Sequence, residues 1–277
     1  MNIAITGASG FIGTRLSARL AAAGHTARPL KRNFNAAELD GCDAVVNLAG
    51  EPVAQRWSDA VKRRIRESRT LGTRRLVAAL GSAGRPNVLV SASAVGYYGD
   101  RGDEVLTEAS AAGQGFLPEV SVEWEREALA ARERGVRVAV VRIGLVLGPG
   151  GGALEKMVTP FRFGVGGRLG SGRQWMPWVH LDDLCALFEM AISLPVEGAF
   201  NGAAPNPVTN ADFTKALGAT LHRPAVLPVP RFAIDLIFGE MAEILFASQR
   251  VVPRAAEAAG FRFHYAEVAE ALKAVLT

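Results

Sequence analysis

Three glycines at a spacing of three residues lie near the start of the sequence, in Gly7-Ala8-Ser9-Gly10-Phe11-Ile12-Gly13. A short apolar stretch that predicts a strand precedes the run, and a stretch with helical periodicity follows it. At such a junction small residues let the backbone approach a phosphate closely, and the first N–H groups of the helix are free to bind it. The spacing alone is a weak signal, so the position of the run carries the prediction of a dinucleotide diphosphate site.

The end of the second predicted strand indicates which dinucleotide is bound. A site for NAD usually has an acidic residue there, which binds the ribose 2′-hydroxyl. In this sequence Lys31 and Arg32 follow Leu30, and no acid is present. Cations at this position suit the additional 2′-phosphate of NADP. We therefore predict that NADP(H) is preferred over NAD(H).

Several segments resemble the extended short-chain dehydrogenase/reductase superfamily. Residues 43–50 resemble its fourth-strand motif, and residues 89–99 resemble the strand that carries its catalytic serine. More specific motifs are Glu51 with Arg56-Trp57, Ser68-Arg69, Trp124-Glu125 and residues 148–153, 170–175, 177–180 and 201–210. Together they resemble the atypical subgroup described as epimerase family proteins of the SDR39U type, which has its own C-terminal domain from about Arg223 onward. The resemblance covers essentially the whole chain.

The resemblance and the glycine run together imply a set of cofactor-binding residues. Arg69 is included because a cofactor with three phosphates needs cations, and Arg142 because it ends a predicted strand at the edge where ligands bind. The full set is Thr6, Gly7, Ser9, Gly10, Phe11, Ile12, Gly13, Lys31, Arg32, Leu48, Ala49, Gly50, Arg69 and Arg142. For Arg69 an exposed helix face is an equal alternative.

The catalytic pair of the superfamily is missing. Its chemistry uses a tyrosine with a lysine four residues later, but here Tyr97, Tyr98 and Tyr265 are followed at that spacing by Arg, Gly and Ala. We expect Ser93 to bind a substrate oxygen, and Tyr97 or Tyr98 to exchange the proton, with wall packing as the alternative for either tyrosine. Glu125 stands out among the acids of its predicted helix because it follows Trp124.

Three further residues are candidates for binding substrate. Arg173 and Trp175 follow a glycine-rich loop, so they are placed to cover a substrate, although Trp175 at a domain interface is an equal alternative. His180 has a side chain suited to acid–base work. It also precedes a predicted helix with Asp182 and Asp183, so a structural hydrogen bond there is the alternative reading.

The elements that must position these residues alternate between strand and helix. Strands are predicted at 2–6, 26–30, 43–49, 87–93 and 137–143, and helices at 11–23, 58–80 and 116–134. Residues 179–194 resemble one more strand and helix returning to the sheet. This order predicts an α/β fold, a Rossmann-type doubly wound parallel sheet with a smaller C-terminal α/β substrate domain. We assign 1–155 and about 179–203 to the Rossmann domain, and about 156–178 and 204–277 to the smaller domain.

Composition narrows the class of protein. The 277 residues carry a net charge of +4 with 21% charged residues, and the basic residues are scattered, which argues against nucleic-acid binding. No apolar run is long enough for a membrane span, and the N-terminus is not a signal peptide, so we expect a cytoplasmic protein. Two cysteines and four histidines without metal-ligand spacing predict no metal site.

Two functions remain open at this stage. The first is an NADP(H)-dependent oxidoreductase or epimerase-like enzyme acting on an unknown small-molecule substrate between the two domains. The second is an inactive NADP(H)-binding sensor or scaffold, which the missing tyrosine and lysine would fit. The superfamily resemblance also implies a homodimer formed by the helices at 58–80 and 116–134.

Overall fold

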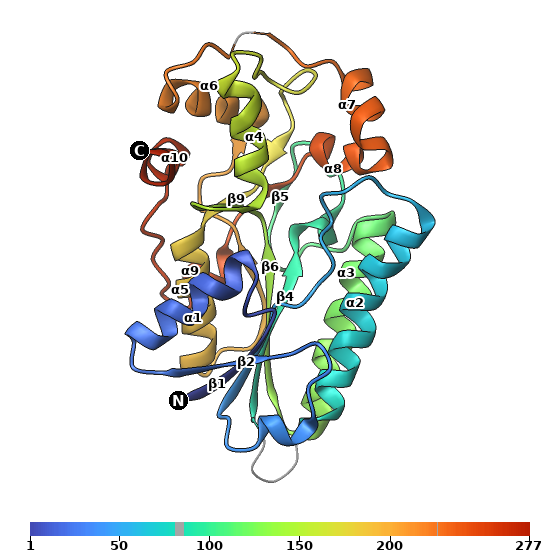
Figure 1. Ribbon diagram of the computed structural model, residues 1–277, viewed down its shortest axis with the longest axis vertical. Coiled ribbons are helices and arrows are strands. Elements are labelled where there is room, and N and C mark those ends of the chain that lie inside the picture. Colours follow the sequence, from blue (N-terminus) through green and yellow to red (C-terminus); the bar gives the residue numbers. More distant parts are fainter. Residues whose placement is uncertain (81–85, 226) are drawn as a thin grey trace.

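The computed structural model describes residues 1–80, 86–225 and 227–277, and its centre is a parallel sheet of six strands (Figure 1). The order is β10-β6-β4-β3-β1-β2. The strands are β1 (Asn2–Thr6), β2 (Thr26–Leu30), β3 (Ala44–Asn47), β4 (Val88–Ala94), β6 (Arg137–Ile143) and β10 (Gly198–Gly202). The sequence predicts the first five closely, because β1, β3, β4 and β6 are largely apolar runs and β2 (Thr-Ala-Arg-Pro-Leu) follows the helix end at Gly24. It does not predict β10, whose sequence Gly-Ala-Phe-Asn-Gly lacks an apolar run.

Helices cover both faces of this sheet. Figure 1 shows α1 (Phe11–Ala22) and α5 (Leu181–Ser193) on one face, and α2 (Asp59–Ala78) and α3 (Phe116–Leu129) on the other. Each face has its own apolar core, and every residue of β3 is buried, as a strand covered on both sides requires. The doubly wound α/β fold predicted from the sequence is confirmed.

The predicted helix ends differ slightly from those observed. The Ser58 hydroxyl accepts a hydrogen bond from the N–H of Val61, so Ser58 is the cap of α2 rather than its first residue. The α-helical part of α3 ends at Leu129 and continues as the 3-10 helix η3 (Ala130–Arg134). Gly135 then ends it with a left-handed backbone.

The C-terminal part packs around a separate core formed by α4 (Gly152–Arg162), α6 (Asn210–Thr220) and α10 (Val268–Leu276). Leu147 and Leu154 already belong to this core, so it begins ahead of residue 155. The remaining short elements are η1 (Ala36–Leu39), η2 (Val95–Tyr98), β5 (Val105–Leu106), β7 (Leu145–Leu147), β8 (Trp175–Met176), β9 (Trp178–His180), β11 (Val208–Thr209), α7 (Arg231–Phe238), η4 (Gly239–Met241), α8 (Ala242–Phe246), β12 (Arg250–Val251) and α9 (Arg254–Ala258).

One strand assignment from the sequence is wrong. The strand within residues 179–194 is β9, and it pairs with β7 in a separate two-stranded sheet, whereas only α5 returns to the central sheet. Gly144 explains the change, because the chain leaves β6 there and the N–H of Leu145 donates to the carbonyl oxygen of Pro177 at 2.7 Å. A Cβ on Gly144 would lie 2.7 Å from that same oxygen, so only glycine permits the switch.

The register of the central strands brings polar residues into one row. Thr6 is paired with Asn47, Ser93 with Arg142, and Arg142 with Asn201. Because parallel strands end at the same edge, this row lies at the carboxyl edge of the sheet, where ligands bind in such folds.

Candidate functional site

The predicted glycine turn joins β1 to α1 and touches the end of β3. Gly7 has a φ of +71°, and a Cβ there would lie 2.9 Å from the carbonyl carbon and oxygen of Leu48. A Cβ on Gly13 would lie 2.2 Å from the oxygen of Gly7. Thr6 holds the same junction, since its hydroxyl oxygen accepts from the N–H groups of Leu48 and Ala49 at 3.2 and 3.3 Å. Side chains are therefore excluded where a phosphate needs close approach to the backbone.

Among the residues that the structure describes, the first N–H groups of α1 have no hydrogen-bond acceptor. Gly10 is the cap residue and provides no side chain, and the first turn carries no acid. The N–H groups of Phe11, Ile12 and Gly13 have no acceptor within the helix, as in any first turn. Together with the exposed Ser9 and Gly10, these donors fit a diphosphate.

The glycine run 148–152 packs on the ring of Phe11. Cβ atoms on Gly148, Gly151 and Gly152 would lie 2.9 to 3.0 Å from that ring. This contact explains the run, and it brings the start of α4 against the start of α1.

Lys31 and Arg32 follow the end of β2 and are both exposed. Within residues 1–80, 86–225 and 227–277, neither forms an ion pair. Both side chains are thus free to bind an anion at the position where the sequence predicts a 2′-phosphate.

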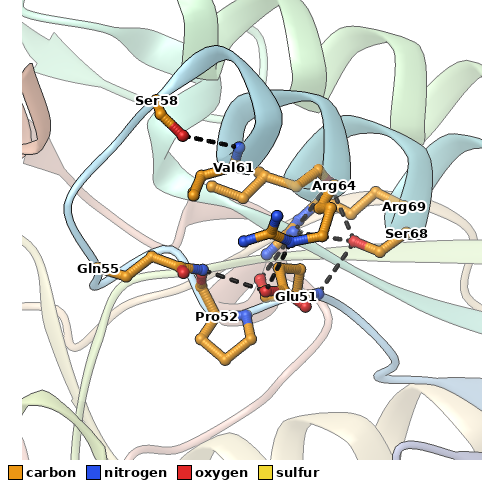
Figure 2. A network of polar contacts seen from close by, with 9 residues as sticks. Glu51, Pro52, Gln55, Ser58, Val61, Arg64, Ser68 and Arg69 are labelled. Carbon is orange, nitrogen blue, oxygen red and sulfur yellow. Dashed lines mark hydrogen bonds and ion pairs between the residues drawn. The ribbon is translucent and has the colours of Figure 1, made fainter.

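The loop after β3 is held to α2 by the polar network in Figure 2. The N–H of Glu51 donates to the Ser68 hydroxyl at 3.0 Å, and Arg69 Nη1 donates to the carbonyl oxygen of Glu51 at 3.1 Å. The Glu51 carboxylate in turn binds Arg64 and accepts from Gln55. The network joins Glu51 to Ser68 and Arg69, two of the motifs singled out in the sequence.

Arg69 itself is placed beside the predicted cofactor residue Gly50. Its guanidinium carbon would lie 3.2 Å from a Cβ on Gly50. Burial lowers the pKa of Arg69 to about 10, against the opposing effect of Glu51. Among the residues that the structure describes, its guanidinium donates only to oxygens of Glu51, Ile65 and Ser68. Arg69 therefore does not lie on an exposed helix face, which is the alternative for it from the sequence.

At the centre of the carboxyl edge lies a buried polar cluster around Ser93. Its hydroxyl donates to Glu125 Oε1 at 2.6 Å, and the Glu125 carboxylate receives Nε and Nη2 of Arg142 at 2.9 Å each. Arg142 Nη1 donates to the Tyr98 hydroxyl at 2.9 Å. The Tyr98 hydroxyl then donates to Asn201 Oδ1 at 2.7 Å. Ser93 is 2% exposed, so its hydroxyl is fixed in one orientation by a charged acceptor.

The structure distinguishes the two candidate tyrosines. Tyr98 is fully buried, and burial raises its pKa. Its hydroxyl accepts a hydrogen bond from Arg142 and donates one to Asn201, so neither its oxygen nor its proton faces a ligand. Tyr97 is half-buried, and its ring lies 3.5 Å from the guanidinium carbon of Arg142. In the described part of the chain the Tyr97 hydroxyl has no hydrogen-bond partner, so of these two tyrosines Tyr97 is the one whose hydroxyl is available to a ligand.

The three predicted substrate residues are not brought together. His180 lines a cavity of about 650 Å³ with Ser9, Gly10 and Phe11, which Arg173 and Trp175 do not line. Its Nδ1 accepts from the N–H of Asp182 at 3.1 Å and thereby caps α5, and its ring lies 3.9 Å from that of Tyr265. Burial lowers the pKa of His180.

Trp175 and Arg173 lie in the C-terminal part. Trp175 Nε1 donates to Asp103 at 2.8 Å, and Arg250 stacks on its ring at 4.5 Å. Arg173 is exposed. These contacts fit the interface alternative for Trp175, and its part in substrate binding stays a prediction.

Comparison with known proteins gives consistent matches over the whole chain. Residues 3–203 match the model of the NAD dependent epimerase/dehydratase family, and residues 229–275 match a domain of unknown function, DUF1731. The chain belongs to the NAD-dependent epimerase/dehydratase family. It is 43% identical to the chloroplastic "Epimerase family protein SDR39U1 homolog" of Arabidopsis thaliana, over all of this chain and 87% of that protein.

Other members of the family are equally similar. An epimerase family protein of Mycobacterium tuberculosis is 44% identical, over 98% of this chain and 96% of that protein. The crystal structure of human epimerase family protein SDR39U1 with NADPH superposes with a TM-score of 0.93 at 35% identity, covering 99% of both chains. The resemblance to the SDR39U-type subgroup is confirmed.

As a member of this family, the chain departs from the expected chemistry on α3. Leu117, Ser121 and Glu125 follow one another at intervals of four on one helix face: Leu117 packs against Gly96, Ser121 is buried, and Glu125 binds Ser93. This helix face therefore carries neither the tyrosine phenol nor the lysine amine of the superfamily's catalytic pair. Sequence reasoning singled out Glu125 but gave no role to Asn201 or Gln249, since only the tertiary structure shows that these amides are buried.

Two searches of the described residues were negative. No helix among them is long and apolar enough to cross a membrane. No group of three or more His, Cys, Asp or Glu side chains among them is placed to hold a metal ion.

Proposed function

We propose that this protein binds NADP(H) and catalyses hydride transfer to or from a small-molecule substrate, as an oxidoreductase or an epimerase-like enzyme. The observation that carries the proposal is the position of Ser93. Its hydroxyl is bound to a buried carboxylate at the same sheet edge as the glycine turn. A nicotinamide cofactor would supply the hydride when bound.

The residues that would hold the cofactor fit its charges. The free N–H groups at the start of α1 would bind the diphosphate, and Lys31 and Arg32 the 2′-phosphate. Residues Leu48, Ala49 and Gly50 would lie beside the ribose of the cofactor. The human relative that was crystallised with NADPH supports this assignment.

Arg69 and Arg142 receive different roles. Arg69 lies against Gly50 without a carboxylate hydrogen bond, so we assign it to the cofactor. The donors of Arg142 are engaged by Glu125, Tyr98 and the carbonyl oxygen of Glu108. We therefore assign Arg142 a positioning role in place of a cofactor contact.

The chain's own groups would handle the proton. Because the Ser93 proton is held by Glu125, the lone pairs of Ser93 are left for a substrate hydroxyl. Tyr97, stacked on Arg142, would supply or receive the proton of the carbonyl or carbinol oxygen. Arg173, Trp175 and His180 remain proposed substrate contacts.

Cofactor binding is tested first by titration with NADPH and NADH, followed by energy transfer from tryptophan to the reduced nicotinamide. The double change Lys31→Ala/Arg32→Ala should weaken NADPH by about tenfold or more and NADH by less than about twofold. Lys215→Ala/Arg223→Ala removes the same charge from exposed positions elsewhere and should alter neither affinity. Equal weakening of both cofactors by the first variant would refute the 2′-phosphate assignment.

Catalysis is tested with a screen of carbinols in the presence of NADP+ and of carbonyl compounds, phenanthrenequinone among them, in the presence of NADPH. Because the lone pairs of Ser93 would accept from a carbinol hydroxyl, Ser93→Ala should lower carbinol turnover by about a hundredfold while NADPH affinity stays within about twofold. Unchanged turnover in this variant would remove Ser93 from the mechanism.

A second function is favoured by one observation, the absence of a phenol and an amine on the α3 face toward Ser93. It is an NADP(H)-binding sensor or scaffold without catalysis. For a sensor, no compound in the screen oxidises NADPH, and bound NADPH changes the oligomeric state measured by sedimentation.

A further inference from the structure

The segment Ser248–Val251 of the C-terminal part contacts η2 and the loop that follows it, directly after β4, the strand that carries Ser93. Gln249 is 9% exposed, and its Nε2 donates to the carbonyl oxygens of Val95 at 3.0 Å and Gly99 at 2.9 Å. Val95 begins η2, and Gly99 follows its last residue. One buried amide thus binds both ends of the short helix that carries Tyr97 and Tyr98.

Ser248 binds the next part of the same loop. Its hydroxyl donates to the carbonyl oxygen of Gly102 at 2.6 Å, and its N–H donates to Asp100 at 3.1 Å. The N–H of Arg101 returns a bond to the carbonyl oxygen of Ser248 at 2.9 Å. The Ser248 hydroxyl also accepts from the N–H of Trp175 at 3.1 Å, which connects the loop to β8.

The contact continues as a strand pair and an apolar cluster. Arg250 and Val251 pair in parallel with Val105 and Leu106. Val251 is fully buried in one cluster with Val95, Tyr98, Leu106 and Ala203, against which Tyr97 packs. The loop is therefore fixed by hydrogen bonds along its length and by packing beneath it.

The helix η2 needs such support because it is only four residues long. A single turn of 3-10 helix is not stable on its own. It is followed by Gly99 at a φ of +65°, and its tyrosines must stay against Arg142 for the cluster around Ser93 to persist.

We propose that Ser248–Val251 is the positioning segment of the active site, with Gln249 as its principal residue. This gives a role to the matched domain of unknown function, residues 229–275: it holds Tyr97 and the end of β4 in the geometry that the reaction needs. The inference rests on the proposed function for its catalytic consequence, but its structural part is tested separately.

The test uses Gln249→Met, which keeps the length of the side chain and removes both N–H donors. The control is Gln174→Met, since Gln174 is 8% exposed and its Nε2 also binds two carbonyl oxygens, those of Leu169 and Leu245, away from η2. Hydrogen exchange followed by mass spectrometry should show peptides covering 95–101 exchanging about tenfold faster or more in Gln249→Met alone. The dissociation constant for NADPH should stay within about twofold in both variants.

Turnover gives the second readout. With phenanthrenequinone as the carbonyl probe, Gln249→Met should lower kcat about tenfold while the KM for NADPH is unchanged, and Gln174→Met should change neither. Ser248→Ala is a smaller change that should also lower kcat, by less than about tenfold, and leave the KM for NADPH unchanged. It replaces Gln249→Met in the test if that variant does not fold.

The outcomes separate the two proposals. Unchanged exchange over 95–101 in both Gln249→Met and Ser248→Ala, or equal effects in Gln174→Met, would overturn the positioning role. If the wild-type protein reduces no carbonyl, the proposed reaction fails, and the exchange result still decides whether the segment holds η2.

Discussion

At the scale of single residues, the buried pair of Glu125 and Arg142 organises the site. Their side chains are 9% and 5% exposed and are joined at 2.9 Å. Removing one member of such a pair leaves the other as a buried, uncompensated charge. The pair therefore fixes Ser93 on one side and Tyr98 on the other only as long as both charges are present.

Glu125→Gln should lower the free energy of unfolding by about 3–5 kcal/mol, because the Arg142 guanidinium then lacks its counter-charge. Glu123→Gln, two residues away on the same helix, removes a partner of Arg66 from a pair whose side chains are 37% and 29% exposed, and should cost less than about 1 kcal/mol. Urea denaturation of both variants makes the comparison. Equal losses would mean that the Glu125 pair is not buried in solution.

The capping residue His180 should make stability depend on pH. Burial lowers its pKa, so the unfolded chain binds the proton more readily than the folded chain. The resulting stability is fully present above the unfolded pKa of about 6.5 and is lost as the pH falls from there through the lower pKa of the folded state. The lowered pKa of neighbouring Asp182, caused mainly by its hydrogen bond to Arg15, contributes stability that is lost only at more acid pH.

In His180→Asn the amide oxygen still caps α5 but does not titrate. Thermal unfolding between about pH 7 and 5 should therefore show a smaller loss of stability in this variant than in the wild-type protein. Parallel pH profiles for the two proteins would assign the loss to other groups.

At the scale of elements, close backbone approach decides what the glycine turn tolerates. Gly13→Ala should destabilise the protein by about 1–3 kcal/mol and weaken NADPH binding, because its Cβ would lie 2.2 Å from the oxygen of Gly7. Gly72→Ala is the matched change in an exposed part of α2 with nothing within 4 Å, and should stabilise by about 0.5–1 kcal/mol. Chemical denaturation measures both, and a stable Gly13→Ala would contradict the close approach.

A comparison of predicted and observed elements shows which parts of the fold the sequence predicts. Strands such as β1 and β6 are predicted with their observed ends, because apolar runs between turn residues are a local signal. The pairing of β9 with β7 depends on contacts at Gly144 and Pro177 that no local pattern records. Likewise, the cofactor turn is predicted from the position of the glycine run between a predicted strand and a predicted helix. The hydrogen bonds of Gln249 and Asn201 to the segment 95–99 join residues more than 100 positions apart, so no local pattern predicts them.

At the scale of the whole molecule, the loop after β3 joins the two parts of the protein. Lys156 of α4 donates to the carbonyl oxygen of Ala54 at 3.2 Å, and Arg56 donates to that of Leu236 in α7 at 3.0 Å. Lys62 of α2 pairs with Glu240 of η4. The loop that borders the predicted cofactor site is therefore also a contact of the C-terminal part.

The homodimer implied by the superfamily remains a prediction, and the structure indicates where to test it. On α2 and α3, Leu71 and Val122 are 47% and 40% exposed. Leu71→Arg/Val122→Arg should convert a dimer into a monomer in sedimentation velocity, since buried charges destabilise an apolar interface. Leu236→Arg/Ile237→Arg on α7 is the control, at residues 75% and 61% exposed. A monomeric wild-type protein would contradict the prediction.

The parallel pair of β5 with β12 has a consequence for the order in which the protein is made. Leu106 must wait for Val251, and Val95 must wait for Gln249, which lies 154 residues later in the chain. A ribosome that has released residues 1–203 has released every strand of the central sheet, but not Gln249, whose amide binds both ends of η2. The strands that carry the predicted cofactor turn are thus synthesised well before the segment that holds η2 in the site proposed for chemistry.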